Sequence, residues 1–217
     1  MESGYPNSGT SIGVSENEDF GALIDALKVV VSVLRDCRVR FMLGGSLAAW
    51  ARGGPEPKKD LDLMLKPEDA ERALECLTNA GLRPERPPEE WLLKAYHGRV
   101  LVDLIFMPSG LEITDEVLDR ADTIPVMAVG TPVMAVEDML VTMLMALDEH
   151  SLDYTRVLAI ARSLREQIDF DRLRVRTADS PYAQAFFTVV RELGIAPADR
   201  PGGHETHSRV RVLPGGA

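Results

Sequence analysis

The sequence predicts an α/β protein of the α+β kind: a small mixed sheet flanked by helices, followed by a C-terminal helical part. Three observations predict it. Apolar residues recur every three or four positions across residues 20–34, which is typical of an amphipathic helix. Short apolar runs at 40–43, 59–66 and 91–107 read as strands, the last one as a hairpin around His97-Gly98. Helical segments then dominate from residue 136 to residue 193.

The remaining elements fit between these. Gly44-Gly45 precedes a short helix that starts at Ser46, and 67–80 reads as a helix with acids in its first turn and Gly81 as its stop. A short helix at 112–121 and a strand at 124–129 complete the first part. The second part is predicted to hold helices at 136–147, 151–166 and 180–193, with a short turn near 169–176.

We therefore divide the chain into four parts. Residues 1–18 are rich in Gly, Ser, Asn and acids, a composition typical of disorder. Residues 19–130 form the α/β core and residues 131–194 the helical part. The Pro- and Gly-rich residues 195–217 are predicted to be a flexible tail.

Composition excludes some classes of protein. A net charge of −10 disfavours a general polyanion binder, whose affinity comes from clustered Lys and Arg. The charge is uneven, because residues 151–217 carry ten Arg against eight acids. Their side chains could be a solvated face or a surface for an RNA acceptor; the candidates are Arg162, Arg165, Arg172, Arg174 and Arg176.

Two further expectations concern the environment of the chain. Cys37 and Cys76 lie far apart in helix-like segments, so we expect buried free thiols in a reducing compartment. The polar, acidic start has no signal-peptide pattern, and no apolar run is long enough to span a membrane. These features predict a cytoplasmic protein that makes no use of a membrane.

Three acids stand out because they interrupt apolar strands. Side chains alternate along a strand, so Asp60 and Asp62 point to one face while Leu61 and its neighbours point to the other. Asp103 has a similar setting in the run RVLVDLIFM. If the two strands are neighbours, the three carboxylates converge, and like charges that close need a cation. Carboxylates with substrate phosphates are the ligands Mg²⁺ prefers, and two such ions can promote an in-line displacement.

The turn Gly44-Gly45-Ser46 supplies a complementary feature. Two glycines let a backbone approach a phosphate closely, and Ser46 adds a hydroxyl. Lys58 and Lys59 stand beside the acids and could hold phosphate charge. Taken singly, a GGS is usually a turn, and an Asp-x-Asp usually lies on the exposed face of an edge strand. Together, in this order and context, they are a more specific indication of a site for phosphate and metal.

The ordered set GGS 44–46, DLD 60–62 and VDLIF 102–106 resembles the DNA polymerase beta-like nucleotidyltransferase superfamily. Later segments, VEDML 136–140 and LDY 152–154, look like its bacterial stand-alone branch, which includes antibiotic nucleotidyltransferases and toxin components. The resemblance implies that Asp60, Asp62 and Asp103 are catalytic and bind two Mg²⁺ ions. Gly44, Gly45 and Ser46 would hold the nucleotide's phosphates.

The implied reaction moves a nucleoside monophosphate from a nucleoside triphosphate to a hydroxyl, releasing pyrophosphate. A toxin that acts on an RNA such as tRNA, with a partner antitoxin, ranks marginally ahead; an antibiotic-modifying enzyme with a small hydroxylated acceptor is the close rival. A non-catalytic nucleotide-binding module is a third reading, because Met143 stands where the branch often has a Lys. Lys58 or Arg156 could substitute for that cation. The branch's Arg and Thr or Ser before the Asp-x-Asp are also replaced, by the run EPKK at 56–59.

Overall fold

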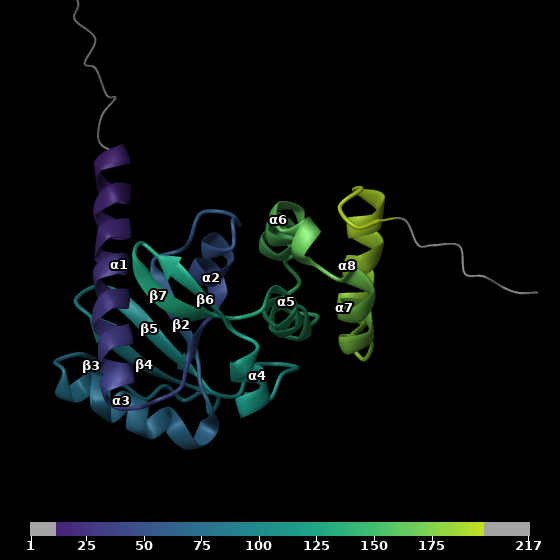
Figure 1. The fold of residues 1–217 in the computed structure, drawn as a ribbon. Coiled ribbons are helices and arrows are strands. Elements are labelled where there is room, and N and C mark those ends of the chain that lie inside the picture. The colour runs from purple at the N-terminus through teal and green to yellow at the C-terminus, as the bar shows by residue number, and fades with distance from the viewer. Residues whose placement is uncertain (1–11, 198–217) are drawn as a thin grey trace, which may run out of the picture.

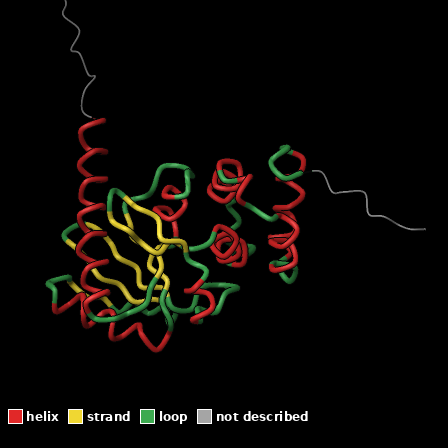
Figure 2. Tube along the Cα trace, in the orientation of Figure 1, coloured by secondary structure: helices red, strands yellow, loops and turns green. Residues whose placement is uncertain are grey.

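A single mixed sheet organises the first part of the chain. The computed structural model describes residues 12–197. Its seven strands lie in the order β3-β4-β5-β2-β1-β7-β6, with β2 parallel to β5 and β1 parallel to β7 (Figures 1 and 2). The strands are β1 (Met42–Leu43), β2 (Asp60–Met64), β3 (Arg83–Glu85), β4 (Leu92–His97), β5 (Val100–Ile105), β6 (Asp122–Val126) and β7 (Val129–Val133).

The two faces of this sheet differ. Helices α1 (Ile12–Asp36) and α3 (Ala70–Asn79) cover one face, and a single 3₁₀ turn (Pro67–Asp69) leads into α3. Leu61, Leu63, Val102 and Leu104 are fully buried. Because side chains alternate, the neighbouring acids of β2 and β5 point to the opposite face.

Of the C-terminal helices, the first two line a cavity on that opposite face, and the last two pack beyond them against the first (Figure 1). These helices are α5 (Val136–Met145), α6 (Thr155–Ser163), α7 (Phe170–Arg176) and α8 (Pro181–Glu192). The side chains of Asp169 and Ser180 cap the first turns of α7 and α8, accepting backbone N–H bonds. The buried Asp138 of α5 pairs with Arg120, which follows α4 (Asp115–Asp119), and with Arg176 of α7. The pair with Arg120 joins the helical part to the sheet part, and the pair with Arg176 joins α5 to α7.

Several elements depart from the sequence prediction. Helix α1 begins at Ile12, inside the segment predicted to be disordered, and the rest of that segment, residues 1–11, lies outside the described residues. Strands β3 and β7 and helix α7 were not predicted. Most of the predicted tail, residues 198–217, also lies outside the described residues.

The two cysteines correct another prediction. Cys37 follows the end of α1 and Cys76 lies in α3, and the structure joins them in a disulfide with a Cα–Cα distance of 6.6 Å. The expectation of free thiols was therefore wrong. Helices α1 and α3 pack side by side on one face of the sheet, which brings together positions 39 residues apart in the chain.

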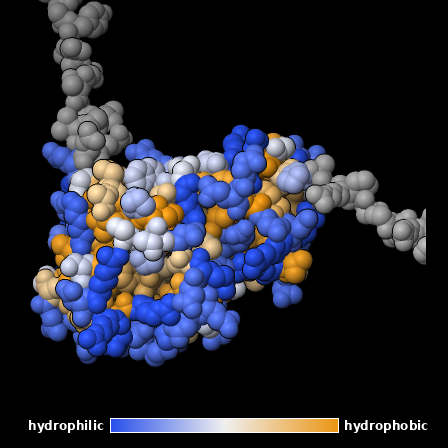
Figure 3. Space-filling view, in the orientation of Figure 1, coloured by the Kyte–Doolittle hydropathy of each residue, from blue (hydrophilic) through white to orange (hydrophobic). Residues whose placement is uncertain are grey.

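Hydrophilic residues cover much of the surface seen in Figure 3, with apolar patches over both parts of the molecule. Within residues 12–197, no helix combines the length and the apolar character that crossing a membrane requires.

Candidate active site

The structure brings Asp60, Asp62 and Asp103 together. Parallel pairing of β2 with β5 sets Asp62 directly beside Asp103, with Asp60 one step earlier on the same face. One carboxylate oxygen from each of the three lies within 4.8 Å of the others. The convergence expected from strand alternation is therefore present.

Burial and mutual repulsion alter the titration of this cluster. Burial raises the pKa of Asp62 to about 6, and the charges of Asp60 and Asp103 act in the same direction. Burial also raises the pKa of Asp103 to about 6, although the nearby Lys94 opposes the shift. The folded protein thus holds acids in a setting that disfavours their ionised forms.

A bound cation would offset the mutual repulsion of the three buried carboxylates. Oδ1 of Asp60 and Oδ1 of Asp103 are buried without a hydrogen-bond partner. Carboxylate oxygens are ligands for hard divalent cations such as Mg²⁺. The residues present therefore fit a divalent metal ion, which would neutralise phosphate charge and polarise a bound substrate.

The glycine turn lies directly against the acids. Helix α2 (Gly45–Ala51) follows β1, and the N–H of Gly44 donates to the carbonyl of Asp62 over 2.8 Å. Gly45 has a φ of +59°, and a Cβ at this position would lie 1.7 Å from Oδ2 of Asp62. Ser46 is buried, and its hydroxyl accepts the N–H of Lys58 over 3.0 Å. Only glycine lets the turn come this close to the carboxylate.

We expect Gly45→Ala to displace the Asp62 carboxylate. Gly53→Ala is the matched control, since Gly53 also has a positive φ, of +94°, but open space around its Cβ position. Both variants should lose roughly 1–2 kcal/mol from the unfavourable backbone. Only Gly45→Ala should also weaken binding of Mn²⁺, measured by electron paramagnetic resonance. Equal Mn²⁺ affinity in the two variants would contradict this account of Gly45.

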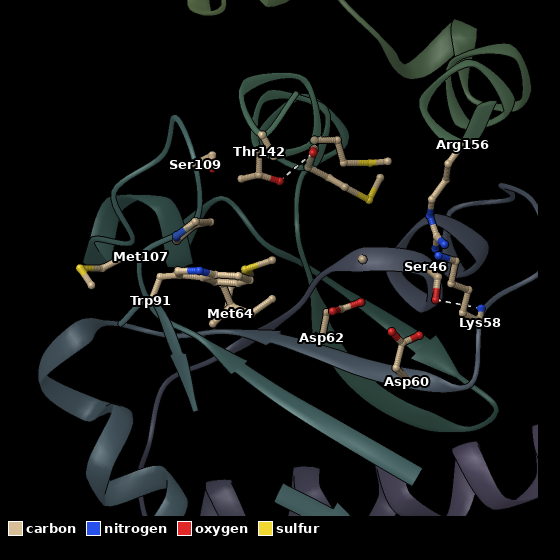
Figure 4. Close-up of a pocket in the computed structure, with 16 residues that line it drawn as sticks. Ser46, Lys58, Asp60, Asp62, Met64, Trp91, Met107, Ser109, Thr142 and Arg156 are labelled. Carbon is tan, nitrogen blue, oxygen red and sulfur yellow. Dashed lines mark hydrogen bonds between the residues drawn. The ribbon is translucent and has the colours of Figure 1, made fainter. Parts of the chain in front are cut away.

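The two predicted lysines behave differently. Lys58 lines the cavity beside the acids (Figure 4). Lys59 instead forms an ion pair with Asp19 of α1, and it is not among the residues that line the cavity. Adjacent residues of an extended segment point to opposite sides, so only one of the two can face the site. Of the two lysines, the structure thus brings Lys58 to the cavity and turns Lys59 toward α1.

Arg156, one of the two residues that the sequence suggested as a substitute for the missing cation, lines the cavity from the helical part. Arg156 of α6 points into the cavity toward Ser46 and Lys58 (Figure 4), and its charge lowers the pKa of Asp62 against the dominant effect of burial. Met143 of α5 also lines the cavity. The position that carries a Lys in the resembling branch is thus apolar here, and Arg156 brings positive charge from the next helix.

The cavity itself measures about 430 Å³ and extends beyond the acids. Its far end is apolar, and we call this the apolar end: Met64, Trp91, Ile105 and Met107 (Figure 4). Trp91 is 44% exposed and lines this end. Trp50, in contrast, packs edge-on against Phe20 with ring centroids 5.3 Å apart.

The two later segments that extended the resemblance have structural roles. Asp138 is buried in the ion pairs described above and does not line the cavity. Asp153 is exposed just before α6, where its carboxylate accepts the N–H of Thr155 over 2.8 Å. Neither segment adds a group to the acid cluster.

Comparison with known proteins shows which family this sequence matches. A family described as uncharacterised nucleotidyltransferases matches residues 44–204, which span both the acid cluster and the helical part. No curated protein sequence matches significantly.

Three solved structures resemble the fold. The solution structure of the antibiotic-resistance factor ANT(2'')-Ia gives a TM-score of 0.55 at 14% identity, covering 81% of this chain and 96% of that one. The crystal structure of ANT(2'')-Ia with adenylyl-2''-tobramycin gives 0.50 at 15% identity, covering 75% and 98%. The lincosamide antibiotic adenylyltransferase LnuA, bound to lincomycin, gives 0.48 at 13% identity, covering 65% and 96%. The ANT(2'')-Ia structures confirm the predicted fold class, a mixed sheet with flanking and C-terminal helices.

Proposed function

Since the chain belongs to a family of nucleotidyltransferases, we propose that it moves a nucleoside monophosphate from a nucleoside triphosphate to a hydroxyl of a small molecule. The observation that carries the proposal is the convergence of three carboxylates, two of which have a buried oxygen without a hydrogen-bond partner, beside an open cavity. A cavity of about 430 Å³ is of the size that small-molecule sites have.

In this proposal Asp60, Asp62 and Asp103 hold two Mg²⁺ ions. Gly44, Gly45 and Ser46 receive the phosphates at the turn, with Lys58 and Arg156 supplying positive charge. The acceptor oxygen forms a bond to the α-phosphorus, the bond from the α-phosphorus to the bridging oxygen breaks, and pyrophosphate leaves with that electron pair. Asp103, the carboxylate on the β5 side of Asp62, takes the proton of the acceptor hydroxyl.

A small acceptor is favoured over RNA because two of the five arginines that could have formed an RNA-binding surface are engaged in contacts within the protein. Arg174 lies over the ring of Phe187, and Arg176 is engaged by the buried Asp138. Three of the five arginines remain exposed: Arg162, Arg165 and Arg172. This exposure is the observation that favours the second candidate function, a toxin that acts on tRNA and is paired with an antitoxin. The adenylylated tobramycin bound to ANT(2'')-Ia provides an example of a small acceptor on a similar fold.

The test combines purified protein, Mg²⁺ and each labelled nucleoside triphosphate with two fractions of a bacterial extract, one of small molecules and one of total tRNA. We expect label on a small molecule with the wild type and none with Asp60→Asn/Asp62→Asn. Tobramycin and lincomycin serve as defined acceptors in parallel. Label on RNA would replace this proposal by the toxin reading. Triphosphate binding without transfer in any fraction would favour the non-catalytic module.

A further inference from the structure

We infer that the apolar end of the cavity binds the acceptor, and that this acceptor is a hydroxylated molecule with an extended apolar face and little positive charge. The inference rests on the proposed function, because it assigns the two ends of one cavity to two substrates.

The first step is the layout of the sheet. Strand β2 lies between β1 and β5, so the two sides of Asp62 are distinct. The glycine turn and α2 follow β1, whereas Asp103 lies on β5. In an in-line displacement the attacking oxygen approaches opposite the leaving pyrophosphate. If the phosphates occupy the glycine turn, the acceptor must enter from the β5 side.

The second step is what stands on that side. Met64 and Ile105 are paired one step beyond Asp62 and Asp103, on the same strands and the same face. The carbonyl of Trp91 accepts the N–H groups of Phe106 and Met107, over 3.1 and 3.3 Å. These bonds hold the backbone at Trp91 against the end of β5. The apolar end thus adjoins the side from which the acceptor must approach.

The third step is charge. The charged residues that line the cavity are Lys58, Asp60, Asp62 and Arg156, and in Figure 4 all four lie to one side of Met64, Trp91 and Met107, with Asp62 nearest to them. The apolar end presents thioether and aromatic surface, and the hydroxyl of Thr142, which also lines the cavity, donates to the carbonyl of Met139. An acceptor with several ammonium groups would lose hydration there without gaining carboxylate partners. An apolar face would gain from the burial, and flexible methionines adapt to irregular shapes.

The test uses Nile red, an uncharged dye whose emission shifts in apolar surroundings. We expect saturable binding to the full chain that weakens about tenfold in Trp91→Ala/Met107→Ser. Met127→Ser is the matched control, because Met127 is 52% exposed against 49% for Met107 but does not line the cavity. Absence of saturable binding, or equal loss in the control, would overturn the inference.

A competition experiment assigns the occupant. A non-hydrolysable triphosphate with Mg²⁺ should bind while Nile red stays in place, and the polycation tobramycin should not displace the dye. Displacement by the triphosphate would mean that the nucleobase occupies the apolar end, and displacement by tobramycin would contradict the acceptor class. Either result overturns the inference alone. Failure of the triphosphate to bind at all would instead overturn the proposed function, and the acceptor role with it.

Discussion

Asp62→Asn should slow nucleotidyl transfer severely and, at the same time, make the metal-free protein more stable near neutral pH. The loss of activity follows from the position of Asp62, between the glycine turn and Asp103. A catalytic metal ion contributes several kcal/mol to transition-state stabilisation, and each 1.36 kcal/mol is a factor of ten, so we expect a loss of about 10³-fold.

The gain in stability follows from the pKa of Asp62, which burial, reinforced by Asp60 and Asp103, raises to about 6. In the unfolded chain the same carboxyl has its ordinary pKa near about 4. The folded state therefore binds the proton more tightly. The stability that this proton contributes is fully present below about pH 4 and is lost as pH rises through about 6. Asparagine cannot ionise, so the variant avoids that loss.

Thermal and urea unfolding at about pH 4 and about pH 8 would measure this, without metal and with added Mg²⁺. We expect a gain of roughly 1–3 kcal/mol at the higher pH and little difference at the lower one. Glu75→Gln, which neutralises an exposed acid in the middle of α3, is the control and should change neither value. Added Mg²⁺ should raise the unfolding temperature of the wild type more than that of Asp62→Asn. A variant that is less stable at both pH values would show that the Asp62 carboxylate stabilises the metal-free fold and is not destabilised by its burial.

The acid cluster could be predicted because it depends on a local rule. Alternation along one strand sets Asp60 and Asp62 on one face, and the leucines between and after them require the other face to be buried. The partner strand with Asp103 carries the same signal. The sequence alone could not predict that β2 and β5 are neighbours or in which register they pair, because α3, β3 and β4 lie between them in the chain.

The elements that were missed have weak local signals. Strand β3 is a three-residue edge strand that contains Pro84, and β7 contains Gly130 and Pro132, all residues that usually mark turns. Helix α7 begins at a cap formed by Asp169, and its polar sequence suggested a turn instead. These segments acquire their structure from neighbours supplied by the rest of the fold.

The contacts between distant segments were the least predictable. The disulfide depends on how α1 packs on α3, and the exposure of Trp91 depends on where β4 meets the end of β5. The separation of Lys58 from Lys59 depends on the side of an extended segment that faces α1. In each case the sequence shows which residue is present, but the contacts of that residue depend on segments that are distant in the chain.

Arg156→Met should weaken binding of the nucleoside triphosphate about tenfold, the effect expected for loss of one charge-assisted contact to phosphate. Arg156 comes from α6 and points at the end of the cavity where Ser46 and Lys58 lie (Figure 4). Arg162→Met is the matched control, since Arg162 lies in the last turn of the same helix but is exposed and outside the cavity. Isothermal titration with a non-hydrolysable triphosphate and Mg²⁺ would measure both affinities.

A second substitution makes this prediction specific to charge at the site. Met143 lines the same cavity from α5, where the resembling branch often carries a Lys. Met143→Lys should therefore restore much of the triphosphate affinity lost in Arg156→Met, although the added lysine lies on a different helix. Recovery would show that the site requires a cation facing the phosphates and that either helix can present it. If Arg156→Met lowers the unfolding temperature but leaves affinity unchanged, Arg156 instead joins the helical part to the sheet through its attraction to Asp62.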